Sequence, residues 1–269
     1  MLTWMLRVSS LTARIGMLAG FAGQMLMAQV PVRPLDANAP AAVQQGSAPS
    51  RFVVVLDAAH GGDDGGGQLA AGSQGGGAHE KTLTLAMSVR LRSLLTARGI
   101  QVVTTREANI PVETDMRVQI ANHAGASACL SLHAAETGSG VHIFVSSLPA
   151  TEQTRFLAWK TAQSAFVTRS LKLASTVNSA LEHSAWPVVA ADAGPIPVTL
   201  ARTALPGVDS MACPALAIEI APIRGADRVV TTEVTDPEYQ AVIAETLAAA
   251  LLAWRTELQG DGSAGGHQP

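Results

Sequence analysis

The feature that most constrains the fold is a set of three apolar runs, each carrying an ionisable side chain at or near its end. The first run, Val53 to Ala59, stops at His60 and is followed by a glycine-rich segment. The second run ends at His133, and the third carries Glu219. Short apolar runs bounded by turn residues predict buried strands. In α/β sheets ligands bind at the carboxyl ends of the strands, so we expect these three side chains to share one edge.

Helices are predicted between these strands. Apolar residues recur at helical spacing from Glu80 to Arg98, and a last helix is predicted from Asp236 to Glu257, with Asp236 as N-cap and Pro237 in the first turn. Further strands are predicted at residues 100–105 and 140–145, and a further helix at 111–124. Residues 151–184 are predicted to be mostly helical. Residues 186–207 are predicted to form a loop with a short strand at 198–201. Strands alternating with helices indicate an α/β fold, a single domain with a mostly parallel central sheet flanked by helices.

The composition agrees with one folded domain. The 269 residues are 48% hydrophobic, which suffices for one sizeable core. The net charge is only -3 and aromatic residues make up 4%, so the composition gives no support for a nucleic-acid partner. We expect a folded, monomeric domain at residues 51–257, preceded by a flexible linker at 29–50 and followed by a disordered tail at 258–269.

The N-terminus has the pattern of an export signal. Arg7 and Arg14 supply positive charge, the stretch Ile15 to Met27 is apolar, and Ala28 ends a segment typical of a cleavage site. The apolar stretch is short for a membrane span, which needs ~20 residues. We therefore predict a signal peptide at residues 1–28 and a periplasmic or extracellular protein, with an uncleaved anchor as the alternative.

Two cysteines, Cys129 and Cys213, each precede a predicted strand. Export to an oxidising compartment would allow a disulfide between them. Two separately buried thiols are the favoured alternative, because a free cysteine behaves as a small hydrophobic residue.

Four residues form a candidate catalytic set: His60, Glu80, His133 and Glu219. Two histidines and a carboxylate are a common ligand set for catalytic zinc, and a further glutamate can act as general base. The set therefore fits metal-assisted hydrolysis of an amide. Three members also have ordinary explanations. His60 alone would be a loop histidine, and His133 alone a satisfied core histidine. Glu80 lies in a first helical turn, where an acidic residue favours the helix dipole. The competing residues are His79, His123, Glu136, His142 and His183. His79 adjoins Glu80, and His142 is expected on the other face of its strand from Val141 and Ile143. His123 and His183 are expected to face solvent.

Several motifs occur in an order that resembles a known family, the zinc-dependent N-acetylmuramoyl-L-alanine amidases of the Amidase_3 type, which cleave cell-wall peptidoglycan. The resemblance extends from about Phe52 to Trp254. In chain order the motifs are Asp57-Ala58-Ala59-His60-Gly61-Gly62, Glu80-Lys81, Thr105-Arg106, Arg117-Val118-Gln119-Ile120-Ala121-Asn122, Ser131-Leu132-His133 and Pro214-Ala215-Leu216-Ala217-Ile218-Glu219.

The resemblance implies one Zn²⁺ per chain, held by His60, Glu80 and His133, with Glu219 as the catalytic glutamate. It implies peptidoglycan as the substrate, cleaved between N-acetylmuramic acid and L-alanine. It is also compatible with an activator protein as a partner. Two rival functions remain: a non-catalytic peptidoglycan-binding or regulatory module that keeps the fold, and a zinc peptidase that cuts within the stem peptide.

Three departures from the family pattern fall next to the candidate residues. Ala59 replaces a glycine before the first histidine, and Ala135 replaces an asparagine. The family's Glu-x-Gly-Phe becomes Glu219-Ile220-Ala221-Pro222, so the glycine-phenylalanine pair after Ile220 is lost. Changes around a metal site can cost 10–100-fold in metal affinity or activity, so we expect these departures to affect efficiency more than the reaction class.

Overall fold

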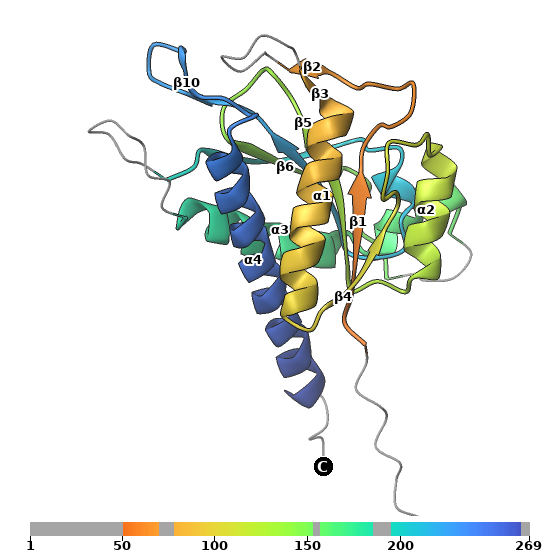
Figure 1. Ribbon diagram of the computed structural model, residues 1–269. Coiled ribbons are helices and arrows are strands. Elements are labelled where there is room, and N and C mark those ends of the chain that lie inside the picture. Colours follow the sequence, from red (N-terminus) through yellow and green to blue (C-terminus); the bar gives the residue numbers. More distant parts are fainter. Residues whose placement is uncertain (1–50, 70–77, 153–156, 185–194, 265–269) are drawn as a thin grey trace, which may run out of the picture. The chain divides into compact units, whose positions relative to one another are not determined.

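The computed structural model describes residues 51–69, 78–152, 157–184 and 195–264, with side chains described as far as residue 260 (Figure 1). The predicted signal peptide and linker lie outside these residues. A six-stranded sheet has the order β4-β1-β5-β8-β6-β7. Its strands are β1 (Val53–Ala58), β4 (Gln101–Thr104), β5 (Ala128–Ala134), β6 (Val141–Ser146), β7 (Val198–Thr203) and β8 (Ala215–Ile220). The helices are α1 (Glu80–Ala97), α2 (Thr114–His123), α3 (Val167–Glu182) and α4 (Pro237–Ala264), with 3-10 helices η1 (Trp159–Ala165) and η2 (Val208–Ser210).

The sheet is mostly parallel, as predicted. Strands β4, β1, β5 and β8 are parallel, whereas β6 is antiparallel to β8 and parallel to β7. Only residues 135–140 separate β5 from β6, and a parallel crossover needs a dozen residues or more, so β6 runs back in the opposite direction. Two short antiparallel pairs lie outside the main sheet: β2 (Gln68–Leu69) with β3 (Ala78–His79), and β9 (Ile223–Arg224) with β10 (Val230–Thr232).

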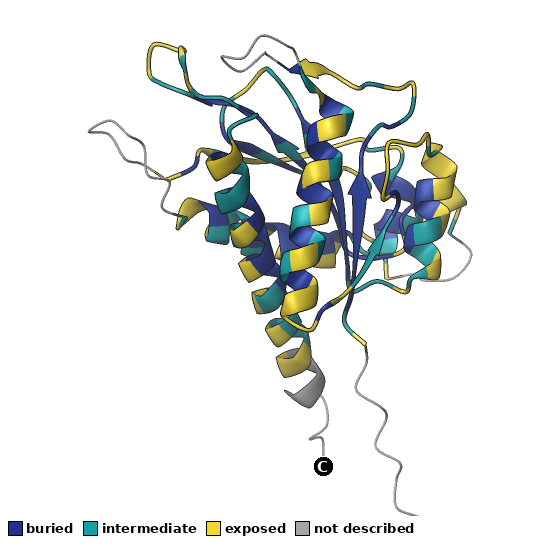
Figure 2. Cartoon of the chain, viewed as in Figure 1, coloured by how far each residue is buried: buried dark blue, intermediate teal, exposed yellow. Residues whose placement is uncertain are grey.

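The two faces of the sheet have different neighbours. One face carries residues such as Leu56, Leu130 and Ile218, which belong to the large core with α1, α3 and α4. The opposite face carries Cys129 and Ala217, which pack in a smaller cluster with α2 and η2. Figure 2 shows the central strands buried and the outward faces of α1 and α4 exposed. The second face therefore packs in the smaller of the two apolar clusters.

Helix α4 begins as predicted and ends later than predicted. The Asp236 Oδ1 atom accepts hydrogen bonds from the N–H groups of Glu238 and Tyr239, at 2.8 and 2.9 Å, which confirms Asp236 as the N-cap. The helix continues to Ala264, so the predicted start of a disordered tail at Leu258 was wrong. Leu258 packs against the large core, which stabilises the additional turns. Within the described residues, no helix has both the length and the apolar character needed to cross a bilayer.

Cys129 and Cys213 form a disulfide, so the favoured prediction of two separate thiols was wrong. Their Cα atoms are 6.2 Å apart, and both side chains are fully buried. Cys129 donates its N–H to the Pro214 carbonyl and pairs with Ala215 in β8. The disulfide therefore joins the start of β5 to the segment entering β8, the two strands that carry His133 and Glu219.

Replacing both cysteines with alanine is expected to destabilise the protein strongly. The cysteines are 84 residues apart, and closing a loop of that length in the unfolded chain corresponds to about 4.5 kcal/mol in the chain-entropy model. The melting temperature should fall by on the order of 10 °C for a domain of this size. Urea unfolding of the double variant and of wild type, both without reductant, measures the difference. Equal unfolding midpoints would show that the pair is not bonded.

Candidate active site

Three of the four predicted residues meet at the carboxyl edge of the sheet. His60 follows β1, Glu80 is the first residue of α1, and His133 lies near the end of β5. The Nε2 atom of His60 is 3.1 Å from Glu80 Oε2, and the Nδ1 atom of His133 is 3.0 Å from Glu80 Oε1. One nitrogen or oxygen from each residue lies within 4.8 Å of the others, a spacing suited to one metal ion.

The backbone at His60 adopts an unusual conformation that aims its ring at this point. His60 has a φ of 62°, which is uncommon for a residue with a side chain, and Gly61 follows with a φ of 137°. A Cβ atom at Gly61 would lie 2.3 Å from the Ile110 carbonyl oxygen, so only glycine fits. Arg117 donates through Nη2 to the His60 carbonyl at 2.7 Å and stabilises the turn.

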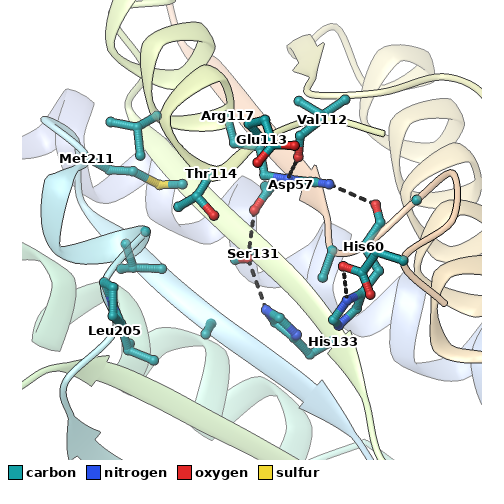
Figure 3. Close-up of a pocket in the computed structure, with 18 of the residues that line it drawn as sticks. Asp57, His60, Val112, Glu113, Thr114, Arg117, Ser131, His133, Leu205 and Met211 are labelled. Carbon is teal, nitrogen blue, oxygen red and sulfur yellow. Dashed lines mark hydrogen bonds and ion pairs between the residues drawn. The ribbon is translucent and has the colours of Figure 1, made fainter. Parts of the chain in front are cut away.

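Hydrogen bonds determine which nitrogen of His133 carries a proton. The Ser131 hydroxyl donates to Asp57 Oδ2 at 2.8 Å, so its oxygen is left to accept from Nε2–H of His133 at 3.3 Å. Figure 3 shows this chain from His133 through Ser131 to Asp57. Nδ1 of His133 therefore presents its lone pair toward Glu80.

His60 has the same arrangement with its ring nitrogens exchanged. Nδ1 of His60 lies 2.8 Å from Asp64 Oδ2, and this bond together with the Gly66 N–H holds the pKa of Asp64 below its ordinary value. With Nδ1 donating to Asp64, the lone pair of Nε2 faces Glu80. Two lone pairs and a carboxylate therefore converge, and a proton or a metal cation between them turns their repulsion into attraction. The donor set fits a divalent metal such as zinc.

Glu80 is buried but remains ionised. Burial raises its pKa, yet the adjacent His133 ring and hydrogen bonds from the N–H groups of Gly67 and Ala134 outweigh burial and bring the pKa below its ordinary value. The two N–H groups lie 2.9 and 3.1 Å from the carboxylate oxygens. Two backbone donors keep this buried carboxylate charged and fixed in orientation, as a metal ligand must be. This favours the metal-ligand prediction over a simple helix-dipole role.

The glycine-rich segment passes close to the ligand atoms. A Cβ atom at Gly66 would lie 2.5 Å from Cδ2 of His60 and 2.7 Å from Oε2 of Glu80. Gly66 also has a φ of 66°, so glycine is required there for two reasons. The remainder of the predicted glycine loop, residues 70–77, lies outside the described residues.

Asp57 is the centre of a buried network beneath the site. It accepts hydrogen bonds from Thr105, Arg117 and Ser131, each at 2.8 Å. Sequence reasoning singled out Thr105, Arg106 and Arg117 only by their resemblance to family motifs. In the structure Arg106 and Arg117 both donate to the Ala58 carbonyl at the end of β1. Asp57, which bonds Thr105 and Arg117, is connected through Ser131 to His133 of the neighbouring strand.

Ala59, the first departure from the family pattern, fits this structure without backbone strain. Its φ is not positive, and its methyl group is buried. Its carbonyl oxygen accepts from the Thr84 hydroxyl and from Arg106, both at 2.9 Å. The unusual backbone conformation lies one residue later, at His60.

The other two departures contribute backbone bonds that fasten the end of β8. The Ala135 N–H donates to the Ile220 carbonyl at 2.9 Å, and the Ala221 N–H donates to the Gly140 carbonyl at 2.8 Å. The Tyr239 hydroxyl donates to the Ala221 carbonyl at 3.0 Å. These bonds fix the strand that carries the fourth candidate residue.

Glu219 lies on the strand next to His133, one of the three converging residues. In β8 it pairs with His133 of β5 on one side and with His142 of β6 on the other. Its side chain is 32% exposed, so water can reach the carboxylate. The sequence correctly placed His142 on the opposite face from the buried Val141 and Ile143, but that is the face of Glu219, and sequence reasoning missed this neighbour.

Three other competitors, His79, His123 and His183, are not among the three converging residues. The His79 side chain is exposed and is not among the converging groups. His123 and His183 are exposed, as expected, and each bonds the carbonyl of the residue four positions earlier.

A cavity of about 550 Å³ opens beside the two histidines (Figure 3). His60 and His133 lie on one side of it, with Asp57 and Ser131 beneath. Its other walls come from the start of α2 and from the segment around η2 and are largely apolar: Pro111, Val112, Val118, Leu205, Pro206, Val208 and Met211. Such a cavity can exclude water from part of a substrate while polar groups act on the rest.

The fold and the site define an α/β protein with a candidate metal centre of two histidines and a glutamate at the edge of its sheet. A family model described as N-acetylmuramoyl-L-alanine amidase matches residues 54–253, and the chain belongs to this family. The predicted family and fold class are both confirmed.

Solved structures show the same fold. The amidase AmiC2 of Nostoc punctiforme is 22% identical, with a TM-score of 0.53, and the match covers 76% of this chain and 97% of that one. An N-acetylmuramoyl-L-alanine amidase from Clostridium difficile 630 is 22% identical, with a TM-score of 0.53 and coverages of 77% and 97%. The CwlD amidase from Clostridioides difficile, in complex with the GerS lipoprotein, is 18% identical, with a TM-score of 0.55 and coverages of 77% and 99%. No curated protein matched the chain by sequence.

Proposed function

We propose that this protein is a zinc-dependent enzyme that hydrolyses the amide bond between N-acetylmuramic acid and L-alanine in peptidoglycan. Family membership supports the reaction and the substrate. The observation that carries the metal assignment is the convergence of His60, Glu80 and His133 within 4.8 Å. These three residues would hold one zinc ion per chain.

Glu219 is the proposed general base and acid. A zinc ion at this site would polarise the scissile carbonyl and make water more acidic. Glu219 accepts a proton from the water that attacks the carbonyl carbon, and it passes that proton to the nitrogen as the C–N bond breaks. The products are the free lactyl carboxylate of the sugar and the free amino group of L-alanine, and Glu219 is again a carboxylate.

The cavity beside the histidines is the proposed binding site for the atoms around the scissile amide. Its apolar walls suit the methyl groups of the lactyl and alanyl units. They also exclude water from the amide, which strengthens electrostatic interactions within the site.

Export and a partner protein remain proposals. Peptidoglycan lies outside the cytoplasm, which supports removal of residues 1–28 as a signal peptide ahead of a linker at 29–50. The presence of a lipoprotein in the CwlD structure supports a search for an activator of this chain. A monomer remains our prediction for the isolated protein.

Digestion of purified sacculi tests the proposed function. Wild-type protein loaded with zinc should release peptides that begin with intact L-alanine, leaving muramic acid with a free lactyl carboxyl group. Mass spectrometry of both fractions identifies the bond. Removal of zinc with a chelator should stop the release, and added zinc should restore it. Peptides cut within the stem would identify a peptidase instead, and no release with stoichiometric zinc would favour a binding module.

A further inference from the structure

We propose that His142 is a positioning residue that holds the carboxylate of Glu219 in its working orientation. This inference rests on the proposed role of Glu219. His142 belongs to β6, the strand that the chain adds antiparallel to β8, and none of the assigned site residues comes from that strand.

The sheet register places the two side chains together. His142 is the direct partner of Glu219 in the antiparallel β6–β8 pair, so the two side chains project from the same face. Nδ1 of His142 lies 3.6 Å from Oε1 of Glu219. The His142 side chain is 20% exposed and that of Glu219 is 32% exposed, so the interaction is only partly screened by solvent.

The backbone selects the tautomer of His142. The Ser139 N–H donates to Nε2 of His142 at 3.4 Å, so Nε2 is an acceptor and the proton of the neutral ring lies on Nδ1. Nδ1–H is the atom that faces Glu219. His142 therefore presents a donor to one carboxylate oxygen without requiring a positive charge on the ring.

The loop that selects this tautomer is itself held in place. Arg224 donates to the carbonyls of Gly138 and Glu136, at 3.1 and 2.8 Å, and its N–H donates to the Ser139 hydroxyl at 3.0 Å. Gly138 has a φ of 94°, and a Cβ atom there would lie 2.5 Å from Cε1 of His142. The loop at residues 136–140 therefore packs directly on the imidazole ring and limits its rotation.

This arrangement places a donor beside one carboxylate oxygen of Glu219, 3.6 Å away, a separation that closes to a hydrogen bond with a small side-chain rotation. A glutamate side chain has three rotatable bonds, and an exposed carboxylate would otherwise sample several orientations. Keeping Oε1 beside His142 would restrict the orientations open to the other oxygen, Oε2. His142 should therefore affect the rate of proton transfer more than substrate affinity.

Substitutions that keep a hydrogen-bonding group at the position of only one ring nitrogen test the inference. Asparagine places its amide near the position of Nδ1, whereas glutamine reaches the position of Nε2. We expect His142→Gln and His142→Phe to lower kcat by about 100-fold, the scale of a misplaced catalytic group, with KM and zinc content unchanged. His142→Asn should recover most of the activity. His183→Phe, a change at the exposed C-cap of α3, is the control and should match wild type.

A second measurement does not depend on activity. Nitrogen-15 NMR of the His142 ring in the zinc-loaded protein should show a protonated Nδ1 and an unprotonated Nε2, and Glu219→Gln should shift the Nδ1 resonance. A proton on Nε2, or equal kcat values for the Asn, Gln and Phe variants, would overturn the inference. If wild type fails to hydrolyse sacculi, the proposed function fails, and the NMR result still decides whether His142 contacts Glu219.

Discussion

Replacing Glu219 with glutamine is expected to lower kcat for sacculus hydrolysis by about 10²–10⁴-fold, the usual contribution of a general acid–base group. Glutamine keeps the shape and a hydrogen-bonding oxygen but cannot accept the proton of the attacking water. Because Glu219 is separate from the three converging residues, the variant should bind zinc as wild type does. Loss of rate with full zinc content is therefore the expected signature.

Single-turnover digestion of labelled sacculi, together with metal analysis of the same samples, measures this effect. Glu182→Gln changes an exposed glutamate at the end of α3 and should leave kcat unchanged. If the Glu219 variant releases peptides at the wild-type rate, another group accepts the proton. If it loses zinc as well as activity, Glu219 is a ligand, and the assignment of the four residues must be revised.

The sequence predicted the parts of the site that follow from sheet geometry. His60, His133 and Glu219 were expected together because parallel strands bring their carboxyl ends to one edge, and β1, β5 and β8 are indeed adjacent. Glu80 was harder to place, because a long glycine-rich segment separates it from His60. Its position depends on the N-terminus of α1, which lies at that edge of the sheet. The alternation of strands and helices predicted this placement of the helix.

What the sequence could not reveal depends on strand direction and on side-chain hydrogen bonds. Alternation placed His142 on the correct face, but only the antiparallel pairing of β6 with β8 sets it opposite Glu219. The role of Asp64 depends on a turn with positive φ at His60, which no local pattern predicts for histidine. The disulfide depended on β5 and β8 being neighbours, a fact of strand order rather than of spacing.

Replacing Glu80 with glutamine should remove the metal, whereas the same change at Glu238 should have no effect on it. Both residues lie in the first turn of a helix, where an acidic side chain favours the helix dipole. Only Glu80 is buried between two histidine nitrogens and bonded to two backbone N–H groups. The neutral amide of glutamine also turns an N–H₂ group toward one of these donors, which it would repel.

We expect the zinc affinity of the Glu80 variant to fall by more than the roughly 10–100-fold that is typical for a residue outside the ligand shell. Competition with a zinc-binding dye measures the affinity, and circular dichroism checks that α1 still forms. The Glu80 variant should also match chelator-treated wild type in residual activity, while Glu238→Gln matches untreated wild type. Stoichiometric zinc in the Glu80 variant would show that Glu80 is not a metal ligand and only favours the helix dipole. The metal centre would then need a different third ligand.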